Sequence, residues 1–321
     1  MLSRRHLRIK ALQALYAFVQ SSNDRLDTGE KELLKSLDKL YEIYIYQLSL
    51  LIEIVEFAQK RIEENKQKYI PAEEDLNPNT RFINNQFIRQ LSDNKNFLKN
   101  IEKYKISWVN SEEIIRKIYK SIRESYDYKD YMNAKIINYE SDKEIFIKII
   151  KKQISRSEIL QFFYEEKNIY WSDDFYTANL LAIKTIKSYR ESWDEYKKLP
   201  ALLKNGESDK NNEDKEFVKN LFRKTILKSD EYDKLIEDKV RNWEMDRIAV
   251  MDILLIKMAL AELLEFPSIP VKVTLNEYIE LAKMYSTPKS RIFVNGILDK
   301  LILDLKSQKK IKKTGRGLLE S

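Results

Sequence analysis

The chain has 321 residues, of which 43% are hydrophobic and 34% are charged, and its formal net charge is +7. A chain of this length and composition can bury a sizeable core, so disorder throughout is excluded. It contains only five glycines and six prolines. These are too few for the tight turns of an all-β sandwich or barrel, and we therefore expect an all-α fold.

The same composition removes most catalytic chemistry. The chain has no cysteine, and His6 is its only histidine. A thiol nucleophile, a disulfide and a cysteine- or histidine-rich metal site are therefore excluded, and a Ser-His-Asp triad would depend on His6 alone. No glycine-rich phosphate loop is present. Carboxylate-only metal chemistry stays open, but no spacing marks a site, and we expect no enzyme activity, cofactor or metal.

Positive charge is concentrated at the two ends of the sequence. Residues 1–23 contain four basic residues and no acidic one, and residues 305–321 contain six basic residues and one acidic residue. The rest of the chain is close to neutral. This distribution favours a polyanionic partner. The alternative is that basic ends only improve solubility, and charge alone does not decide between the two.

The first helix is expected over residues 4–20. Ser3 is its predicted N-cap, and apolar residues repeat from Leu7 to Phe18 at helical spacing. The basic start and apolar run resemble a secretory signal, but Gln13 and Gln20 interrupt the run and no cleavage site follows. We therefore predict an amphipathic helix that the mature protein retains. No apolar run reaches the ~20 residues of a membrane span, so we expect a soluble, cytoplasmic protein.

The sequence predicts a series of helices in the middle of the chain. Residues 31–69 predict one long or broken helix, residues 71–80 a loop, and residues 82–199 further helices without proline or glycine. Residues 200–214 combine a proline, a glycine and a polar run, which is typical of a linker. No fixed period indicates a repeat protein.

The last hundred residues give sharper signals. A long apolar helix is predicted over about 246–265, with Asp246 as its cap and Glu262 on its core face. Thr274 and Glu277 form a predicted capping box, which would start the next helix at about Leu275. Thr287 and Pro288 predict the start of a final helix. Gly296 inside that helix predicts the close approach of another helix.

Three stretches of the sequence together resemble the NusB family of bacterial transcription antitermination factors. The stretches are Arg4-Arg5-His6-Leu7-Arg8 with Ala11-Leu12-Gln13-Ala14-Leu15-Tyr16; Trp243 and Arg247 leading into Lys257-Met258-Ala259-Leu260-Ala261-Glu262-Leu263; and Ile269–Glu277 followed by Glu280-Leu281-Ala282-Lys283 and Phe293-Val294-Asn295-Gly296-Ile297-Leu298-Asp299-Lys300. The resemblance covers residues 3–20 and about 214–305.

The resemblance implies a two-subdomain helical bundle carrying a large helical insertion. Residues 1–23 would supply the first helix with its basic start, and residues 214–305 the remaining core helices. One small bundle would contain the first helix and the helices after the linker, and the other the helices from Trp243 onward. Residues 24–213 would be a helical insertion of unknown role, and residues 306–321 a basic tail.

The resemblance also implies a function. Members of the family bind boxA RNA of ribosomal RNA transcripts together with NusE, a small-subunit ribosomal protein, and act without catalysis in the antitermination complex of RNA polymerase. On this basis Arg4, Arg5 and Arg8 are predicted to bind RNA, because arginine binds phosphates and base edges with a planar fork and stacks on unpaired bases.

Further site residues follow from the same resemblance. Tyr16 and Tyr285 match family aromatics near the RNA, although Tyr16 could equally be a packed core residue. Lys289 and Arg291 begin the final helix, where exposed amides and positive charge favour phosphate; here the sequence replaces a more acidic family stretch. Asp252 matches an acidic residue presented to NusE, with a solvated helix position as the alternative.

The sequence has two alternative interpretations. A protein-only scaffold with little RNA binding stays open, because the insertion gives no functional signal. The fold also occurs as the N-terminal domain of some RNA cytosine methyltransferases. We expect no such activity here, because the chain has no cysteine and no catalytic domain follows the resemblance.

Overall fold

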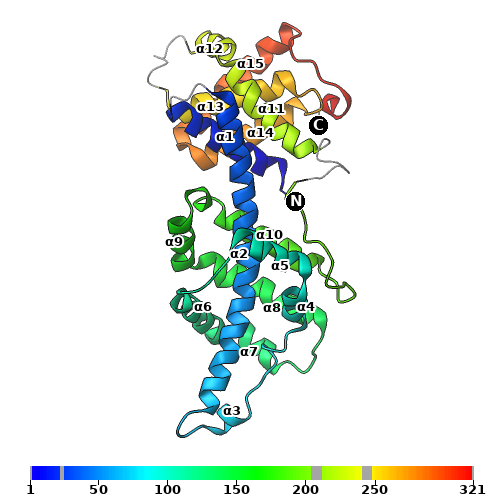
Figure 1. The fold of residues 1–321 in the computed structure, drawn as a ribbon. Helices are drawn as coiled ribbons and strands as arrows, with labels where there is room; N and C mark the ends of the chain where they lie inside the picture. Colours follow the sequence, from blue (N-terminus) through cyan, green and yellow to red (C-terminus); the bar gives the residue numbers. More distant parts are fainter. Residues whose placement is uncertain (1, 22–24, 204–211, 241–247, 320–321) are drawn as a thin grey trace. The chain divides into compact units, whose positions relative to one another are not determined.

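The computed structural model describes residues 2–21, 25–203, 212–240 and 248–319, and the regular structure of this part of the chain is helical (Figure 1). The predicted all-α class is confirmed. The chain forms two compact units: unit 1 is Met1–Leu37 with Leu202–Ser321, and unit 2 is Asp38–Ala201. Helix α2 (Leu26–Lys66) begins in unit 1 and ends in unit 2.

Unit 1 contains the start of α2, six further α-helices and a final short 3-10 helix in its described residues. The bounds are α1 Arg4–Gln20, α11 Glu213–Leu227, α12 Ser229–Glu237, α13 Val250–Glu265, α14 Val271–Tyr285, α15 Pro288–Ser307 and η5 Gly315–Leu318.

Helix α13 is the centre of unit 1. It packs against α1, α11, α12, α14 and α15, and every side chain from Met258 to Leu263 is buried. A helix buried on all sides needs an apolar sequence, which explains why its hydrophobic residues are almost continuous. Phe266 follows α13 as its C-cap, so the helix ends at Glu265, as predicted. The predicted cap Asp246 lies outside the described residues.

Two sequence predictions about α14 and α15 were wrong. Helix α14 starts at Val271 with Pro270 at the N-cap, one turn before the predicted Leu275. Thr274 is therefore inside the helix, and its hydroxyl donates to Glu262 instead of capping. On α15, a Cβ added to Gly296 would meet no atom within 4 Å, so no helix approaches this glycine closely.

The predicted start of α15 is confirmed: the Ser290 amide donates to Thr287 Oγ1.

Unit 2 contains the second part of α2 and eight shorter α-helices in its described residues. The bounds are α3 Glu73–Leu76, α4 Gln86–Asp93, α5 Lys95–Tyr104, α6 Glu112–Glu124, α7 Tyr126–Asn133, α8 Tyr139–Lys152, α9 Glu158–Lys167 and α10 Phe175–Ser188, with 3-10 turns η1 Ile154–Arg156 and η2 Ile169–Trp171. The short α3 lies within the predicted 71–80 loop.

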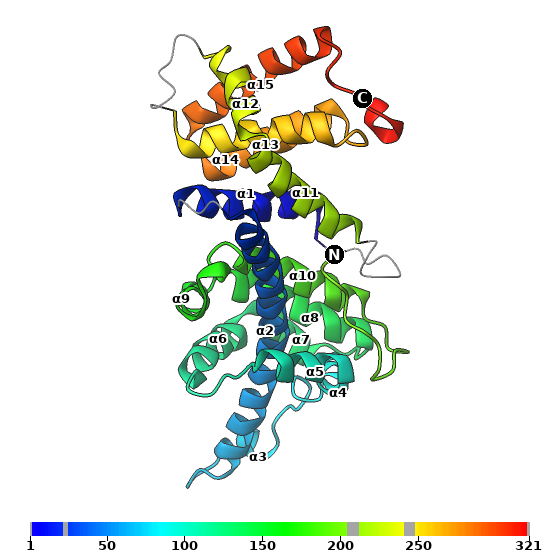
Figure 2. The ribbon, with the colours of Figure 1, turned by 45° about the horizontal axis from the view of Figure 1, so that its top comes forward.

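The second part of α2 is the core element of unit 2. In both views the shorter helices α4–α10 surround it (Figure 1; Figure 2). Its residues from Ile43 to Leu51 are all buried, and its polar side chains find buried partners. Tyr44 Oη and Thr185 Oγ1 are 2.8 Å apart, and Tyr164 Oη donates to Gln47 Oε1 at 2.7 Å. These hydrogen bonds satisfy groups that would otherwise be costly to bury.

The first turns of α2 belong to unit 1 because of their contacts there. A Cβ on Gly29 would lie 2.6 Å from the Phe222 ring and 2.7 Å from Phe18, so glycine allows α2 to pack closely against α1 and α11. Glu30 also pairs with Lys219 and Arg223 of α11. Unit 2 covers residues 38–201, which lie within the residues 24–213 expected as an insertion.

Candidate nucleic-acid interface

The candidate site starts with the first two turns of α1, which carry Arg4, Arg5 and Arg8. The Ser3 hydroxyl caps the helix by accepting from the His6 amide, as predicted. Helix α1 packs on α11 and α13. This packing fixes where each arginine points, and the three side chains have different environments.

Arg8 lies in the core of unit 1. It is 2% exposed, and its Nε and Nη2 donate to the two carboxylate oxygens of fully buried Glu262, both at 2.7 Å. Thr274 Oγ1 also donates to Glu262 at 2.9 Å. Burial lowers the pKa of Arg8, but the hydrogen bonds and charge of Glu262 outweigh it and raise that pKa overall. In this conformation the Arg8 guanidinium is not accessible to RNA, contrary to its predicted role as a contact residue.

Arg5 is half-exposed and faces α14. Its Nε and Nη2 donate to the two oxygens of Glu277 at 2.9 and 2.8 Å, a two-pronged ion pair. Arg8 Nη1 approaches the same carboxylate at 3.5 Å. The hydrogen bonds that Arg5 donates to Glu277 raise the pKa of Arg5. Glu277 thus occupies the face of Arg5 that would bind a phosphate.

Arg4 points toward α11. Its Nε lies 3.2 Å from Asp214 Oδ1, and its guanidinium carbon lies 4.3 Å above the centre of the Phe217 ring. Each of the three predicted arginines is therefore paired with a carboxylate. These acidic partners were not predicted from the sequence. The signal that could have found one of them is Glu262, a lone carboxylate on the apolar face of α13, because a buried carboxylate needs a cation.

The pKa of Glu280 on α14 is influenced by several basic residues. A hydrogen bond from Lys283 lowers this pKa, and the charges of Lys283, Arg5 and Arg291 lower it further. Arg5 belongs to α1 and Arg291 to α15, so basic residues of three helices act on this one carboxyl.

The other predicted site residues are distributed over unit 1. Lys289 is exposed on the first turn of α15, which contains no acidic residue. Tyr16 is 39% exposed on α1, and Tyr285 is half-buried at the end of α14. Asp252 is only 4% exposed, and it accepts a hydrogen bond from Ser286 Oγ at 2.5 Å. Its carboxylate is held by the end of α14 instead of being presented on the surface.

Two further properties concern the described residues as a set. No helix among them has the length and apolar character needed to cross a membrane. No three acidic or histidine side chains in this part of the chain are grouped in a way that could hold a metal ion.

Comparison with known proteins identifies the class of this helical bundle. The model of the NusB family matches residues 177–303, which includes nearly all of the resemblance expected over 214–305 and leaves α1 outside. The transcription antitermination protein NusB of Salinibacter ruber is 49% identical over 105 residues, 33% of this chain and 66% of that protein. That of Chloroherpeton thalassium is 42% identical over 106 residues, 33% of this chain and 50% of that protein.

A third relative settles the family. The NusB protein of Koribacter versatilis is 38% identical over 104 residues, which are 32% of this chain and 71% of that protein. The chain belongs to the NusB family. The chain spans about two thirds of the length of the Salinibacter protein and half that of the Chloroherpeton protein. In both alignments the matched part is about one third of this chain. No solved structure matches significantly.

Proposed function

We propose that the protein is a non-catalytic, RNA-binding transcription antitermination factor. It would bind boxA-type RNA of ribosomal RNA transcripts together with NusE, as a component of the antitermination complex of RNA polymerase in the cytoplasm. Three relatives carry the name transcription antitermination protein NusB, and this supports the class of function.

The observation that carries the RNA proposal is that basic residues of three helices of unit 1 act on one carboxyl. Arg5, Lys283 and Arg291 come from α1, α14 and α15 and influence the same carboxyl of Glu280. Lys289 lies exposed on the first turn of α15, and Tyr285 ends α14. An unpaired RNA strand needs this combination of cations for phosphates and aromatic faces for bases.

The three arginines of α1 then take different roles. Arg4 and Arg5 would contact phosphates directly after exchanging Asp214 and Glu277 for RNA. Arg8 would act as a positioning residue, because its pair with Glu262 ties α1 to α13. Tyr16, exposed on α1, would extend the contact along this helix.

Asp252 is proposed to contribute to NusE binding indirectly. Its hydrogen bond from Ser286 fixes the link between α14 and α15. We infer that the partner contacts this link, which Asp252 holds in shape.

A protein scaffold with little RNA binding remains the second candidate. The observation that favours it is the pairing of all three α1 arginines with carboxylates. Paired arginines offer less net charge to a polyanion than the sequence suggests.

The test is a titration of the full chain against boxA-containing RNA and a scrambled RNA, with and without NusE, at two salt concentrations. The Arg4→Ala/Arg5→Ala variant is compared with Arg116→Ala/Lys117→Ala, which removes two exposed charges from α6. We expect selective, salt-dependent binding that NusE strengthens and that only the first variant weakens. Equal weak binding to both RNAs, unchanged by NusE and by the α1 arginines, would favour the scaffold.

A further inference from the structure

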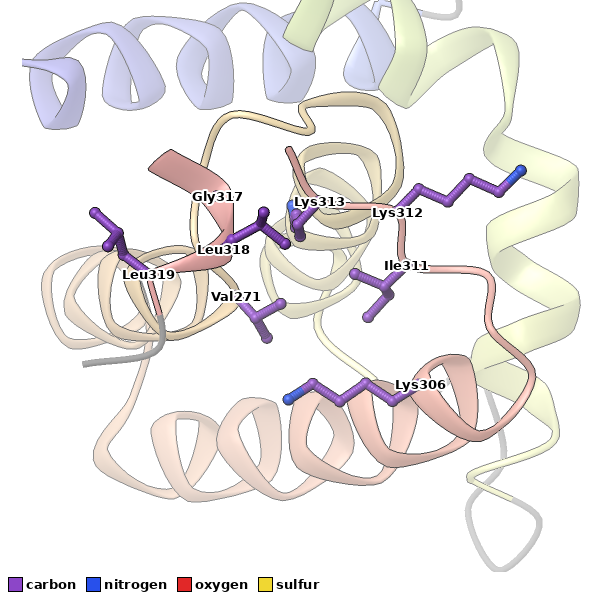
Figure 3. A pocket seen from close by; sticks show the side chains of 8 residues that line it. All are labelled: Val271, Lys306, Ile311, Lys312, Lys313, Gly317, Leu318 and Leu319. Atoms are coloured by element: carbon purple, nitrogen blue, oxygen red, sulfur yellow. The ribbon is translucent and has the colours of Figure 1, made fainter. Parts of the chain in front are cut away.

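Each of the two compact units contains a cavity, and the two cavities differ in charge. In unit 1, a cavity of about 920 Å³ lies between the start of α14, the end of α15 and the tail that follows α15 (Figure 3). Its charged lining residues are Lys306, Lys312 and Lys313. Lys313 Nζ donates to the carbonyl of Phe266 at 3.1 Å, and the tail itself supplies most of the lining. This cavity is therefore part of how the tail docks on unit 1.

The cavity of unit 2 is acidic and partly aromatic. It has a volume of about 360 Å³ and lies between α4, the start of α8 and the segment after α10. Asp93 of α4 and Glu191 and Glu195 of that segment supply its charge, and Tyr139 and Trp193 supply aromatic rings. No cationic side chain is among the described residues that line it. Cavities of roughly 300–1,000 Å³ are typical of small-molecule sites.

The wall of this cavity is held in place by the side chain of Gln90 on α4. Gln90 Nε2 donates to the carbonyl of Arg190 at 3.0 Å and to that of Trp193 at 2.8 Å. Gln90 Oε1 accepts a hydrogen bond from the hydroxyl of Tyr139. One side chain thus connects α4, the start of α8 and the segment after α10. Because the cavity is formed before a ligand arrives, binding has a small cost in conformational entropy.

Two lysines of the chain itself show which chemical group this wall accepts. Lys95 Nζ lies 3.5 Å from Glu195 Oε2, and Lys197 Nζ lies 4.8 Å from the centre of the Trp193 ring. A carboxylate and an indole of the lining therefore each interact with a primary ammonium group. Both lysines are exposed, and exposed pairs of this kind contribute little to stability. A ligand that carries the same group can replace them.

The other two carboxylates of the cavity have no counter-charge in the described part of the chain. Neither Asp93 nor Glu191 forms an ion pair there. No three of the described carboxylates are grouped closely enough to hold one metal ion. Negative charges spread over an aromatic wall suit a flexible ligand with several positive charges better than a single inorganic cation. Methylene groups between those charges can pack on the rings.

We propose that the cavity of unit 2 binds an aliphatic polyamine, a linear ligand in which methylene groups separate two or more ammonium groups. The ammonium groups pair with Asp93 and Glu191, and with Glu195 once it has exchanged Lys95 for the ligand. The methylene groups pack on Trp193. The site belongs to unit 2 alone, so the proposal does not depend on RNA binding by unit 1.

The test is isothermal titration calorimetry of the full chain with spermidine, at low salt and without RNA. We expect binding of one spermidine per chain. The variant Asp93→Asn/Glu191→Gln should bind at least fivefold more weakly, because it removes both unpaired carboxylates and keeps their shapes. Both side chains are exposed, so the far-UV circular dichroism of this variant should match that of the unaltered chain.

The matched control is Glu113→Gln/Glu124→Gln, which removes two exposed charges from α6 and should leave spermidine binding unchanged. The proposal is overturned if the two double variants bind spermidine alike, or if the unaltered chain does not bind it at about 1 mM. It is also overturned if Mg²⁺ at the same concentration of charge displaces spermidine completely, which would indicate general attraction of cations. Binding of an arginine-containing peptide without binding of spermidine would assign the cavity to a protein partner instead.

Discussion

The arginines of α1 have two different roles, and Arg8, which is buried with Glu262, has the structural one. Both side chains are inaccessible, and both Glu262 oxygens are hydrogen-bonded. Burying two charges costs several kcal/mol, and the cost is offset only while both partners are present. Arg8 is therefore a core residue, whereas Arg4 and Arg5 on the same two turns remain half-exposed.

Removing Arg8 alone should destabilise unit 1 strongly. Arg8→Met leaves the Glu262 carboxylate buried without a counter-charge, and we expect the free energy of unfolding to fall by about 3–5 kcal/mol. The double variant Arg8→Met/Glu262→Met should recover most of this loss. Urea unfolding followed by far-UV circular dichroism measures both values. Arg5→Met, which breaks a half-exposed pair, should cost less than about 1 kcal/mol; an equal cost for Arg8→Met would contradict the assigned core role.

Glu277 should act as a competitor of RNA for Arg5. Glu277→Gln removes the charge but keeps a similar shape, so the Arg5 fork becomes available to phosphate. If the proposed RNA binding is correct, we expect boxA affinity to rise about two- to fivefold at low salt, the scale of a half-exposed ion pair. Glu113→Gln, which removes one exposed charge from α6, is the matched control. Unchanged or weaker binding by Glu277→Gln would show that Glu277 positions Arg5 and does not compete.

At the scale of elements, the sequence predicted helices well where a local signal decides the boundary. Ser3 and Thr287 each cap the helix they were expected to cap, since a single side-chain oxygen meets a free amide one turn later. The start of α14 was missed because Thr274 and Glu277 match a capping box locally. Their side chains bond Glu262 and Arg5 of other helices instead. Such long-range partners are invisible in a local pattern.

The tail after α15 carries a prediction about pH. Burial lowers the pKa of Lys313 from 10.5 to about 8. Between pH 8 and 10 the unfolded chain therefore holds a proton on Lys313 that the folded chain has lost, so this residue makes stability rise with pH. We therefore compare the free energies of unfolding of the wild type and Lys313→Met. The difference, wild type minus variant, should increase by about 1 kcal/mol between pH 8 and pH 10. This is less than the whole change in the pKa of Lys313 would give, because Lys313 is half-exposed. Urea titrations of both proteins at pH 8 and pH 10 measure it, and a constant or shrinking difference would contradict the docked tail.

At the scale of the whole molecule, the sequence separated a recognisable core from a long stretch without functional motifs. Residues 214–305 resembled a family because their motifs were specific, whereas residues 38–201 offered only helical periodicity. The junction was harder to predict. No proline or glycine interrupts the sequence from Glu30 to Ile70, so α2 continues from unit 1 into unit 2. The contacts of Gly29 and Glu30 that assign its first turns to unit 1 involve α1 and α11, which are distant in sequence.

Because each unit has its own buried core, the two should lose structure in separable steps. Three of the four tryptophans, Trp108, Trp171 and Trp193, belong to unit 2. With Trp243→Phe in the background, tryptophan fluorescence then reports on unit 2, while circular dichroism reports on both units. Arg8→Met destabilises unit 1. We therefore expect the part of the circular dichroism transition that comes from unit 1 to move to lower urea concentration, and the fluorescence midpoint, which reports on unit 2, to stay nearly unchanged. A fluorescence midpoint that moves as far as the circular dichroism midpoint would mean that α2 couples the units into one cooperative structure. Trp108→Phe, tested alone, alters the core of unit 2 and provides the reciprocal measurement.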